Sequence, residues 1–288
     1  EPEEPEEPEL VSVIVDNADA TGVTKTGTWK TAGTQTDRYG ANYLHDDNAA
    51  KGTKSVTFAP TLPFPGYYRV TMMWPQHPNR EDAVQVDIVH DGATSTTAVD
   101  QRSNGGVWNP LGTYYFQAGT GGSVTIRNDA LASPDGYVVA DAVRFERLPD
   151  PIIVDNADSS GVTKIGTWTT ANTQADRYGA DYLHDGNAGK GTKSVTFTPE
   201  LPISGTYEVY LMWPEHFNRE DAVQVDVVHN GTASTVAVDQ RSNGGVWNLI
   251  GTYAFQAGTG GSVTIRNDAL ASPDGYVVAD AVKFVPVG

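Results

Sequence analysis

The sequence predicts an all-β protein made of two tandem antiparallel β-sandwich modules of jelly-roll type. Two observations carry this prediction. Short segments alternate polar and apolar residues with the period of two that β-strands require, and Gly, Pro and Asp turns separate them. The chain also repeats itself once, at an interval long enough for a complete domain. No stretch keeps helical periodicity for three turns, so we expect no long helix.

The first ten residues differ from the rest of the chain. Residues 1–9 read EPEEPEEPE, in which like charges repel and prolines favour an extended polyproline II form. We interpret residues 1–10 as the end of a Pro/Glu-rich linker between domains, which implies a further domain upstream. A disordered tail of a complete protein is the alternative. We expect residues 11–149 to form the first β-sandwich module and residues 150–288 the second.

The repeat has a constant offset. Val15 recurs as Val154 and Trp108 recurs as Trp247, an offset of 139 residues in both cases, and no insertion or deletion separates the copies. This interval far exceeds the 20–50 residues that are typical of solenoid repeats. Each copy is therefore expected to fold as a domain of its own.

Four segments of the first copy show the strand pattern most plainly. In chain order they are residues 54–58, 66–72, 85–90 and 123–127. In the third of them, for example, Val86 and Ile88 fall on one face. The apolar closing segment 137–145 is expected to be a central strand. About nine short strands in each copy suit a sandwich of two sheets.

Composition excludes several classes of protein. The chain has 288 residues, no Cys and a formal net charge of −17. Without Cys it has neither disulfides nor a Cys-based zinc or redox site. Its apolar runs are too short to span a membrane. An acidic chain without clustered Lys and Arg is also not expected to bind nucleic acid.

Several motifs of the first copy together resemble a known family. They are Val15-Asp16-Asn17, Gly27-Thr28-Trp29, Tyr43-Leu44-His45-Asp46, Met73-Trp74-Pro75, Gly105-Gly106-Val107-Trp108-Asn109, Leu111-Gly112-Thr113-Tyr114 and residues 136–143, GYVVADAV. This pattern resembles the golvesin C-terminal-like domain, which is similar to the C-terminal carbohydrate-binding module of xanthan lyases. The resemblance implies a β-sandwich attached to secreted enzymes that act on polysaccharide or cell wall. It thus implies an extracellular location, a polysaccharide partner and an upstream catalytic domain, and it supplies no site residues.

The first candidate binding segment, residues 74–82, follows a predicted strand and recurs at residues 213–221. Aromatic rings stack on the C–H faces of sugars, and planar Arg and Asn groups bind hydroxyls in pairs. The alternative is that the Trp ends a core strand and that the charged residues form a local ion-pair turn. The candidates are Trp74, His77, Asn79, Arg80, Trp213, His216, Asn218 and Arg219.

The second candidate segment, residues 100–109, recurs at residues 239–248. It joins amide and guanidinium side chains to a pair of glycines, which allow a ligand to approach the backbone closely. The alternative is an ordinary hairpin or bulge with its Trp in the core. The candidates are Gln101, Arg102, Asn104, Trp108, Gln240, Arg241, Asn243 and Trp247.

The third candidate segment is a long aromatic connection at residues 37–46, repeated at residues 176–185. Long loops in compact domains are often functional, although such a loop can also merely pack over a sandwich. The candidates are Tyr39, Tyr43, His45, Tyr178, Tyr182 and His184.

Acidic residues near the first and last predicted strands suggest a structural calcium ion. Calcium binds six to eight oxygen ligands, but no EF-hand spacing is present, and the same residues can also cap turns or pair with arginines. No other cofactor is expected. The candidate ligands are Asp16, Asp19, Asp141, Asp155, Asp158 and Asp280.

No catalytic motif stands out. The chain lacks a Gly-x-Ser-x-Gly elbow and a His-Glu-x-x-His pair, and a doubled, nearly identical domain is more typical of binding modules. We therefore predict a non-catalytic tandem carbohydrate-binding module of a secreted polysaccharide-degrading enzyme, with avidity from its two copies. The resemblance alone favours an acidic, xanthan-like polysaccharide. The alternatives are a structural or adhesive surface spacer and a peptidoglycan-binding module.

Overall fold

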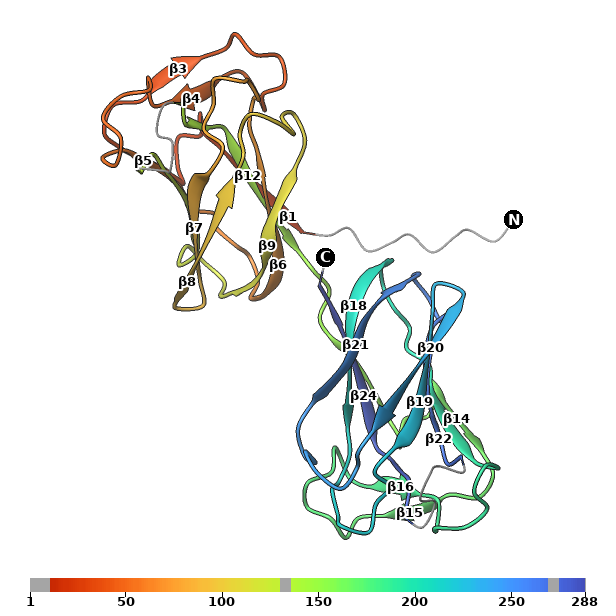
Figure 1. The fold of residues 1–288 in the computed structure, drawn as a ribbon. Coiled ribbons are helices and arrows are strands. Elements are labelled where there is room, and N and C mark those ends of the chain that lie inside the picture. Colours follow the sequence, from red (N-terminus) through yellow and green to blue (C-terminus); the bar gives the residue numbers. More distant parts are fainter. Residues whose placement is uncertain (1–10, 130–135, 269–274, 288) are drawn as a thin grey trace. The chain divides into compact units, whose positions relative to one another are not determined.

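The structure, a computed structural model, describes residues 11–129, 136–268 and 275–287 (Figure 1). It divides into two compact units between Leu148 and Pro149. In the described residues every regular element is a β-strand, and neighbouring strands pair in the antiparallel sense. The predicted fold class, all-β with tandem sandwich modules, is confirmed. None of these residues belongs to a helix with the length and hydropathy needed to cross a membrane.

The first unit contains three sheets, with strand orders β1-β12-β6-β9, β2-β5-β10-β7-β8 and β11-β4-β3. The strands are β1 (Ser12–Asp16), β2 (Val23–Thr26), β3 (Lys30–Ala32), β4 (Tyr43–His45), β5 (Ser55–Phe58), β6 (Gly66–Met73), β7 (Val84–His90), β8 (Ala93–Val99), β9 (Asn109–Phe116), β10 (Ser123–Arg127), β11 (Val139–Ala140) and β12 (Ala142–Arg147).

The second unit repeats this arrangement, with strand orders β13-β24-β18-β21, β14-β17-β22-β19-β20 and β15-β16-β23. The strands are β13 (Ile152–Asp155), β14 (Val162–Ile165), β15 (Thr169–Ala171), β16 (Tyr182–His184), β17 (Ser194–Phe197), β18 (Gly205–Met212), β19 (Val223–His229), β20 (Thr232–Val238), β21 (Asn248–Phe255), β22 (Ser262–Arg266), β23 (Val278–Ala279) and β24 (Ala281–Pro286).

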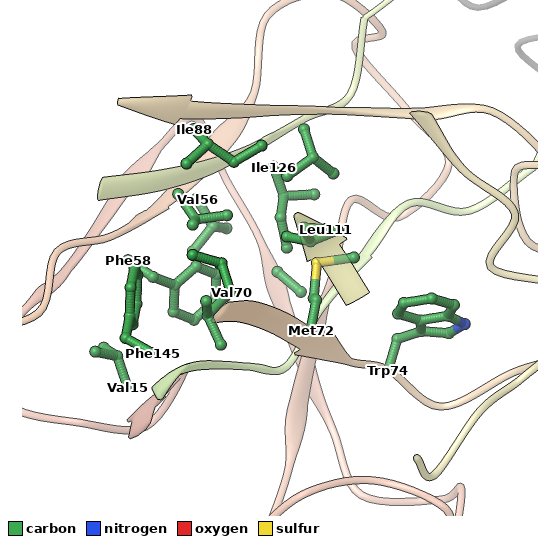
Figure 2. Packing of buried hydrophobic residues seen from close by; sticks show 14 of the residues in the cluster. Val15, Val56, Phe58, Val70, Met72, Trp74, Ile88, Leu111, Ile126 and Phe145 are labelled. Carbon is green, nitrogen blue, oxygen red and sulfur yellow. The ribbon is translucent and has the colours of Figure 1, made fainter. Parts of the chain in front are cut away.

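The core of the first unit draws side chains from both large sheets (Figure 2). Tyr68, Val70 and Met72 alternate along β6 and are fully buried. Phe58 of β5 and Ile88 of β7 belong to the same cluster and come from the five-stranded sheet. The period-two pattern of the sequence therefore marks the inward face of these strands.

The predicted closing strand 137–145 is two strands. β11 pairs with β4 in the small sheet, whereas β12 lies between β1 and β6 in the four-stranded sheet. Asp141, which is fully buried, stands at the break between them. The small sheet lies at one end of the sandwich (Figure 1) and forms the floor of the candidate site described next.

The buried carboxylate of Asp46 stabilises the loops at this end of the fold. Asp46 is fully buried, and its Oδ1 accepts the backbone N–H of Val138 at 3.0 Å. Its Oδ2 accepts from Lys51 Nζ at 2.9 Å and from Asn128 Nδ2 at 3.2 Å. Because a buried charge is stable only when it is paired and hydrogen-bonded, this network holds the loops around β4 in one arrangement.

Candidate functional site

A pocket of about 330 Å³ opens on the small sheet of the first unit. Its walls come from β3, β4, the loop after β6 and the residue that follows Gly136. The structure thereby brings together residues from two of the three candidate segments. The lining residues are Ala32, Thr34, Gln35, Tyr43, His45, His77, Asn79, Arg80 and Tyr137.

Arg80 organises this pocket. It is only 8% exposed, and its guanidinium lies 5.7 Å from the centre of the Tyr43 ring and 5.9 Å from that of Tyr137. Its Nη1 donates to Asn79 Oδ1 at 2.9 Å, and its Nη2 donates to the Tyr43 hydroxyl at 3.4 Å. One cation thus positions two aromatic rings and an amide.

The backbone on both sides of Arg80 is fixed by the segment that ends in Tyr137. Tyr137 N donates to Asn79 O at 2.9 Å, and Glu81 N donates to Tyr137 O at 3.1 Å. Gly136 N donates to the buried carboxylate of Glu81 at 2.9 Å. A side chain on Gly136 has no room, because a Cβ there would lie 2.5 Å from the carbonyl carbon of Arg80.

Two histidines stand at the pocket. His45 is half-buried, its ring centre lies 5.5 Å from that of Tyr137, and its Nδ1 accepts the N–H of Asp47 at 3.1 Å. Burial lowers the pKa of His45, so its imidazole is neutral at neutral pH. His77 and Asn79 are exposed at the opening. The pocket thus presents imidazole, amide and phenol groups around the guanidinium of Arg80, and such groups form hydrogen bonds with hydroxyl groups.

The second unit keeps these contacts. Arg219 lies 5.7 Å from the ring centre of Tyr182 and 5.8 Å from that of Tyr276. Its Nη1 donates to Asn218 Oδ1 at 3.0 Å. The ring of His184 lies 5.5 Å from that of Tyr276. The arrangement around Arg80 is therefore a property of the repeated fold.

Tyr39 and Trp108, two of the aromatic residues predicted to bind carbohydrate, form a cluster outside the pocket around Arg80. The rings of Tyr39 and Trp108 lie 5.5 Å apart, and the Arg144 guanidinium of β12 lies 4.9 Å from the Trp108 ring centre. In the second unit Tyr178 and Trp247 repeat the pair at 5.4 Å, and Lys283 replaces the arginine at 4.7 Å from Trp247. None of the first-unit members of this cluster lines the pocket on the small sheet.

Trp74 and Trp213 are core residues, contrary to the binding role predicted for them. Each is 3% exposed. Their indole nitrogens donate to the backbone oxygens of Ser103 at 3.0 Å and Ser242 at 3.2 Å. Figure 2 shows Trp74 beside the buried side chains of the sandwich. The alternative interpretation, a Trp that ends a core strand, is the one the structure supports.

Gln101 and Gln240 also serve the fold, contrary to the prediction. Gln101 is fully buried, and its amide both donates to Val139 O and accepts from Val139 N, each at 2.9 Å. Gln240 makes the same pair of bonds to Val278. With donor and acceptor both engaged by buried backbone, these amides are not available to a ligand.

The remaining candidates occupy less favourable positions. Tyr43 lines the pocket on the small sheet, but Tyr43 and Tyr182 are each 3% exposed and so offer no free ring face for the predicted stacking. Arg102 is exposed but paired with Asp100 at 3.0 Å and with Asp82 at 3.2 Å. The second unit repeats these pairs, with Arg241 between Asp239 and Asp221. The remaining two candidates, Asn104 and Asn243, lie on exposed turns and have positive φ angles.

The predicted calcium ligands do not gather as a set. Among the described residues no three His, Cys, Asp or Glu side chains form a group that could hold a metal ion. Asp19 instead accepts the backbone N–H of Asp16 at 2.9 Å, and Asp158 does the same for Asp155. Asp141 and Asp280 are fully buried, and burial raises the pKa of each to about 7.

The sequence does not point to Tyr137 and Tyr276 as site residues. The segment around Tyr137 is strongly apolar, and its pattern predicts a central strand. Tyr137 reaches the pocket through a short parallel bridge to Arg80. The only sequence signal is its Gly136 neighbour, which marks a place where two backbones come close.

Comparisons with known proteins agree with this fold. The model of the golvesin C-terminal domain matches the chain twice, over residues 13–147 and 152–286. A xanthan lyase from Bacillus sp. (strain GL1) is 79% identical over 137 residues, which are 48% of this chain and 15% of that protein. The solved structure of a Paenibacillus xanthan lyase is 41% identical, with a TM-score of 0.53, over 92% of this chain and 25% of that one. The chain thus spans a small part of both lyases. Since each family match covers one compact unit, the chain belongs to the golvesin C-terminal domain family and carries two copies of the domain.

Proposed function

We propose that the chain is a non-catalytic, tandem carbohydrate-binding module of a secreted, extracellular polysaccharide-degrading enzyme. The observation that carries this proposal is the pocket around Arg80, whose arginine, tyrosine and histidine contacts recur around Arg219. The relatives are named xanthan lyases, and this chain matches only a small part of each. An upstream catalytic domain is the partner that this proposal implies.

The chemistry of the pocket favours a ligand rich in hydroxyl groups. His77 and Asn79 are exposed at its opening and offer an imidazole and an amide. His45 is neutral at neutral pH and lies beside Tyr137. Sugar hydroxyls both donate and accept, as these groups do, and the partly buried ring of Tyr137 supplies apolar contact for C–H groups.

The charges of the site bear on which polysaccharide it binds. Arg80 is shielded between two tyrosines, and Arg102 is paired with two carboxylates. The net charge of −17 also repels an anionic polymer at long range. We therefore infer that the hydroxyl groups of the polymer supply most of the binding energy. Xanthan is the first polysaccharide to test because the relatives are named for it.

Two sites on one chain add avidity. Once one domain holds the polymer, the other binds it at a high effective concentration, and affinity rises by roughly a hundredfold or more where both can engage. This gain gives a physical reason for the duplication.

Affinity electrophoresis of the whole chain through gels that contain xanthan, other acidic polysaccharides or neutral glucans tests the proposal. We expect retardation in at least one gel and normal mobility for the variant with His45→Ala and His184→Ala. A matched control, Gln117→Ala with Gln256→Ala, changes exposed residues outside the pocket and should be retarded like the wild type. Unchanged mobility of the wild type in every gel would overturn the proposal and favour a surface spacer or a peptidoglycan-binding module.

A further inference from the structure

The two domains differ at one conspicuous surface position. Phe217 is 83% exposed, more than any other large apolar side chain among the described residues. Water contact with a whole benzene ring is unfavourable, and most phenylalanines are buried. The corresponding residue of the first domain is Pro78. The exposed ring is thus a feature of the second domain only.

Phe217 borders a polar pocket of about 290 Å³. Asn218, Asp221 and Arg241 are among the residues that line it. Their amide, carboxylate and guanidinium groups are partly engaged within the protein, but each keeps hydrogen-bonding capacity for neighbouring hydroxyls. An exposed ring beside such groups matches a pyranose, which has an apolar C–H face and a polar rim.

The ring of Phe217 contacts that of His216. The ring of His216 lies 4.3 Å from it at an interplanar angle of 35°. His216 Nδ1 in turn lies 2.8 Å from Asn218 Oδ1, a hydrogen-bonding distance. Because the histidine is itself anchored, the tilted pair of rings is pre-organised, and a ligand loses less entropy when it binds.

The charges of this pocket are balanced. Arg241 pairs with Asp221 at 3.2 Å and with Asp239 at 3.0 Å. Glu220, buried beneath the pocket, lies 3.4 Å from Lys190. Since the charged groups already neutralise one another, the pocket favours a neutral sugar over a uronic acid.

We propose that Phe217 is a stacking platform for a neutral pyranose residue of the polysaccharide, with Asn218, Asp221 and Arg241 binding its hydroxyl groups. The second domain therefore binds more tightly than the first, and the two copies are not equivalent. This inference rests on the proposed carbohydrate-binding function and adds a sugar class and an unequal division of binding between the domains.

Reciprocal exchange of the two residues tests the inference in the whole chain. The variants are Phe217→Pro, Pro78→Phe and the double exchange, and each new residue already occurs at the same position of the other copy. We measure affinity electrophoresis in neutral glucan gels and titration calorimetry with soluble neutral gluco-oligosaccharides. Phe217→Pro should weaken binding about tenfold, Pro78→Phe should strengthen it, and the double exchange should restore wild-type affinity, because the platform has moved to the other domain.

The outcomes separate this inference from the proposed function. If Phe217→Pro binds as tightly as the wild type while the His45→Ala and His184→Ala variant does not bind, the platform is wrong and the proposed function stands. If the wild type binds an acidic polysaccharide but no neutral glucan, the inference is overturned as well. If the wild type binds nothing, both fail. Phe217→Ala removes the ring without locking φ or deleting the backbone N–H, and so guards against a local effect of proline.

Discussion

The guanidinium of Arg80 lies over the ring of Tyr43, and its Nη2 also donates to the hydroxyl of that tyrosine at 3.4 Å. The same cation holds Tyr137 and the amide of Asn79. The planar guanidinium does this with donors on two separate nitrogens, which a compact ammonium group does not have. The shape of the pocket therefore depends on arginine and not merely on positive charge.

Replacing Arg80 and Arg219 by Lys should weaken polysaccharide binding while charge is conserved. Lysine lacks the two separate nitrogens from which Arg80 donates to Asn79 and to the Tyr43 hydroxyl, so we expect at least a tenfold loss of affinity. The loss of hydrogen bonds to a charged group should also cost roughly 1.5 to 3 kcal/mol of stability in each domain. Affinity electrophoresis and urea denaturation measure the two effects. Wild-type affinity in the lysine variant would show that Arg80 does not shape the pocket.

Trp74→Ala with Trp213→Ala should lower stability and should not act on the ligand directly. Truncation of a fully buried Trp costs about 3 to 5 kcal/mol. Trp108→Ala with Trp247→Ala should cost less, because these rings are only partly buried. Urea denaturation of both double variants provides the comparison. If the Trp74 variant keeps its stability but loses binding, the core position of this residue is wrong.

The strands show what periodicity can predict. The segment 123–127 coincides with β10, and 85–90 lies within β7, because one face of each is buried in the core and the other is not. The break at Asp141 was not predictable in this way. It arises because β11 and β12 pair with strands of different sheets, and such long-range pairing leaves no local pattern.

The candidate site shows more clearly what residue type alone fails to predict. Residue type suggested that Trp74 binds a ligand, yet the inward series Tyr68, Val70 and Met72 continues to Trp74 with a period of two. The alternation was therefore a better guide than the aromatic side chain. Tyr137, in contrast, reaches Arg80 only through tertiary pairing of distant segments.

The raised pKa of Asp141 predicts that the stability of the protein depends on pH. Burial raises its pKa to about 7; the N–H of Tyr39, at 2.9 Å from Oδ2, opposes this shift. Of the neighbouring charges, Asp16 and Asp37 raise the pKa and Arg38 lowers it. The pKa in the unfolded chain is about 3.9. The native state thus binds the proton more strongly than the unfolded state does.

Stability should accordingly fall as pH rises. The contribution of the protonated carboxyl is fully present below about pH 3.9 and is lost as pH rises through about 7, with an upper bound of roughly 4 kcal/mol per group. Asp141→Asn with Asp280→Asn keeps a neutral side chain at all pH values and should flatten this slope. Thermal denaturation between pH 4 and 8, with a chelator present, measures it. The control Asp91→Asn, which reproduces Asn230 of the second copy, should keep the wild-type slope. Equal slopes in all three proteins would refute the assignment.

Gly136→Ala with Gly275→Ala tests the backbone contact on which the pocket depends. A Cβ at Gly136 would lie 2.5 Å from the carbonyl carbon of Arg80, and the same clash arises between Gly275 and Arg219 at 2.6 Å. Backbone atoms cannot rotate away as a side chain does, so we expect a cost of about 1 to 3 kcal/mol in each domain and displacement of the arginine.

The chain supplies a matched control for this substitution. Gly121 is exposed, and a Cβ there would meet no atom within 4 Å, so Gly121→Ala should leave stability within about 0.5 kcal/mol of the wild type and binding unchanged. Polysaccharide affinity is compared under conditions in which all variants are folded. Weak binding by a folded Gly136 variant would mean that the position of Arg80, and not only its presence, determines affinity. Full affinity in that variant would instead show that binding does not depend on the close approach of these two segments.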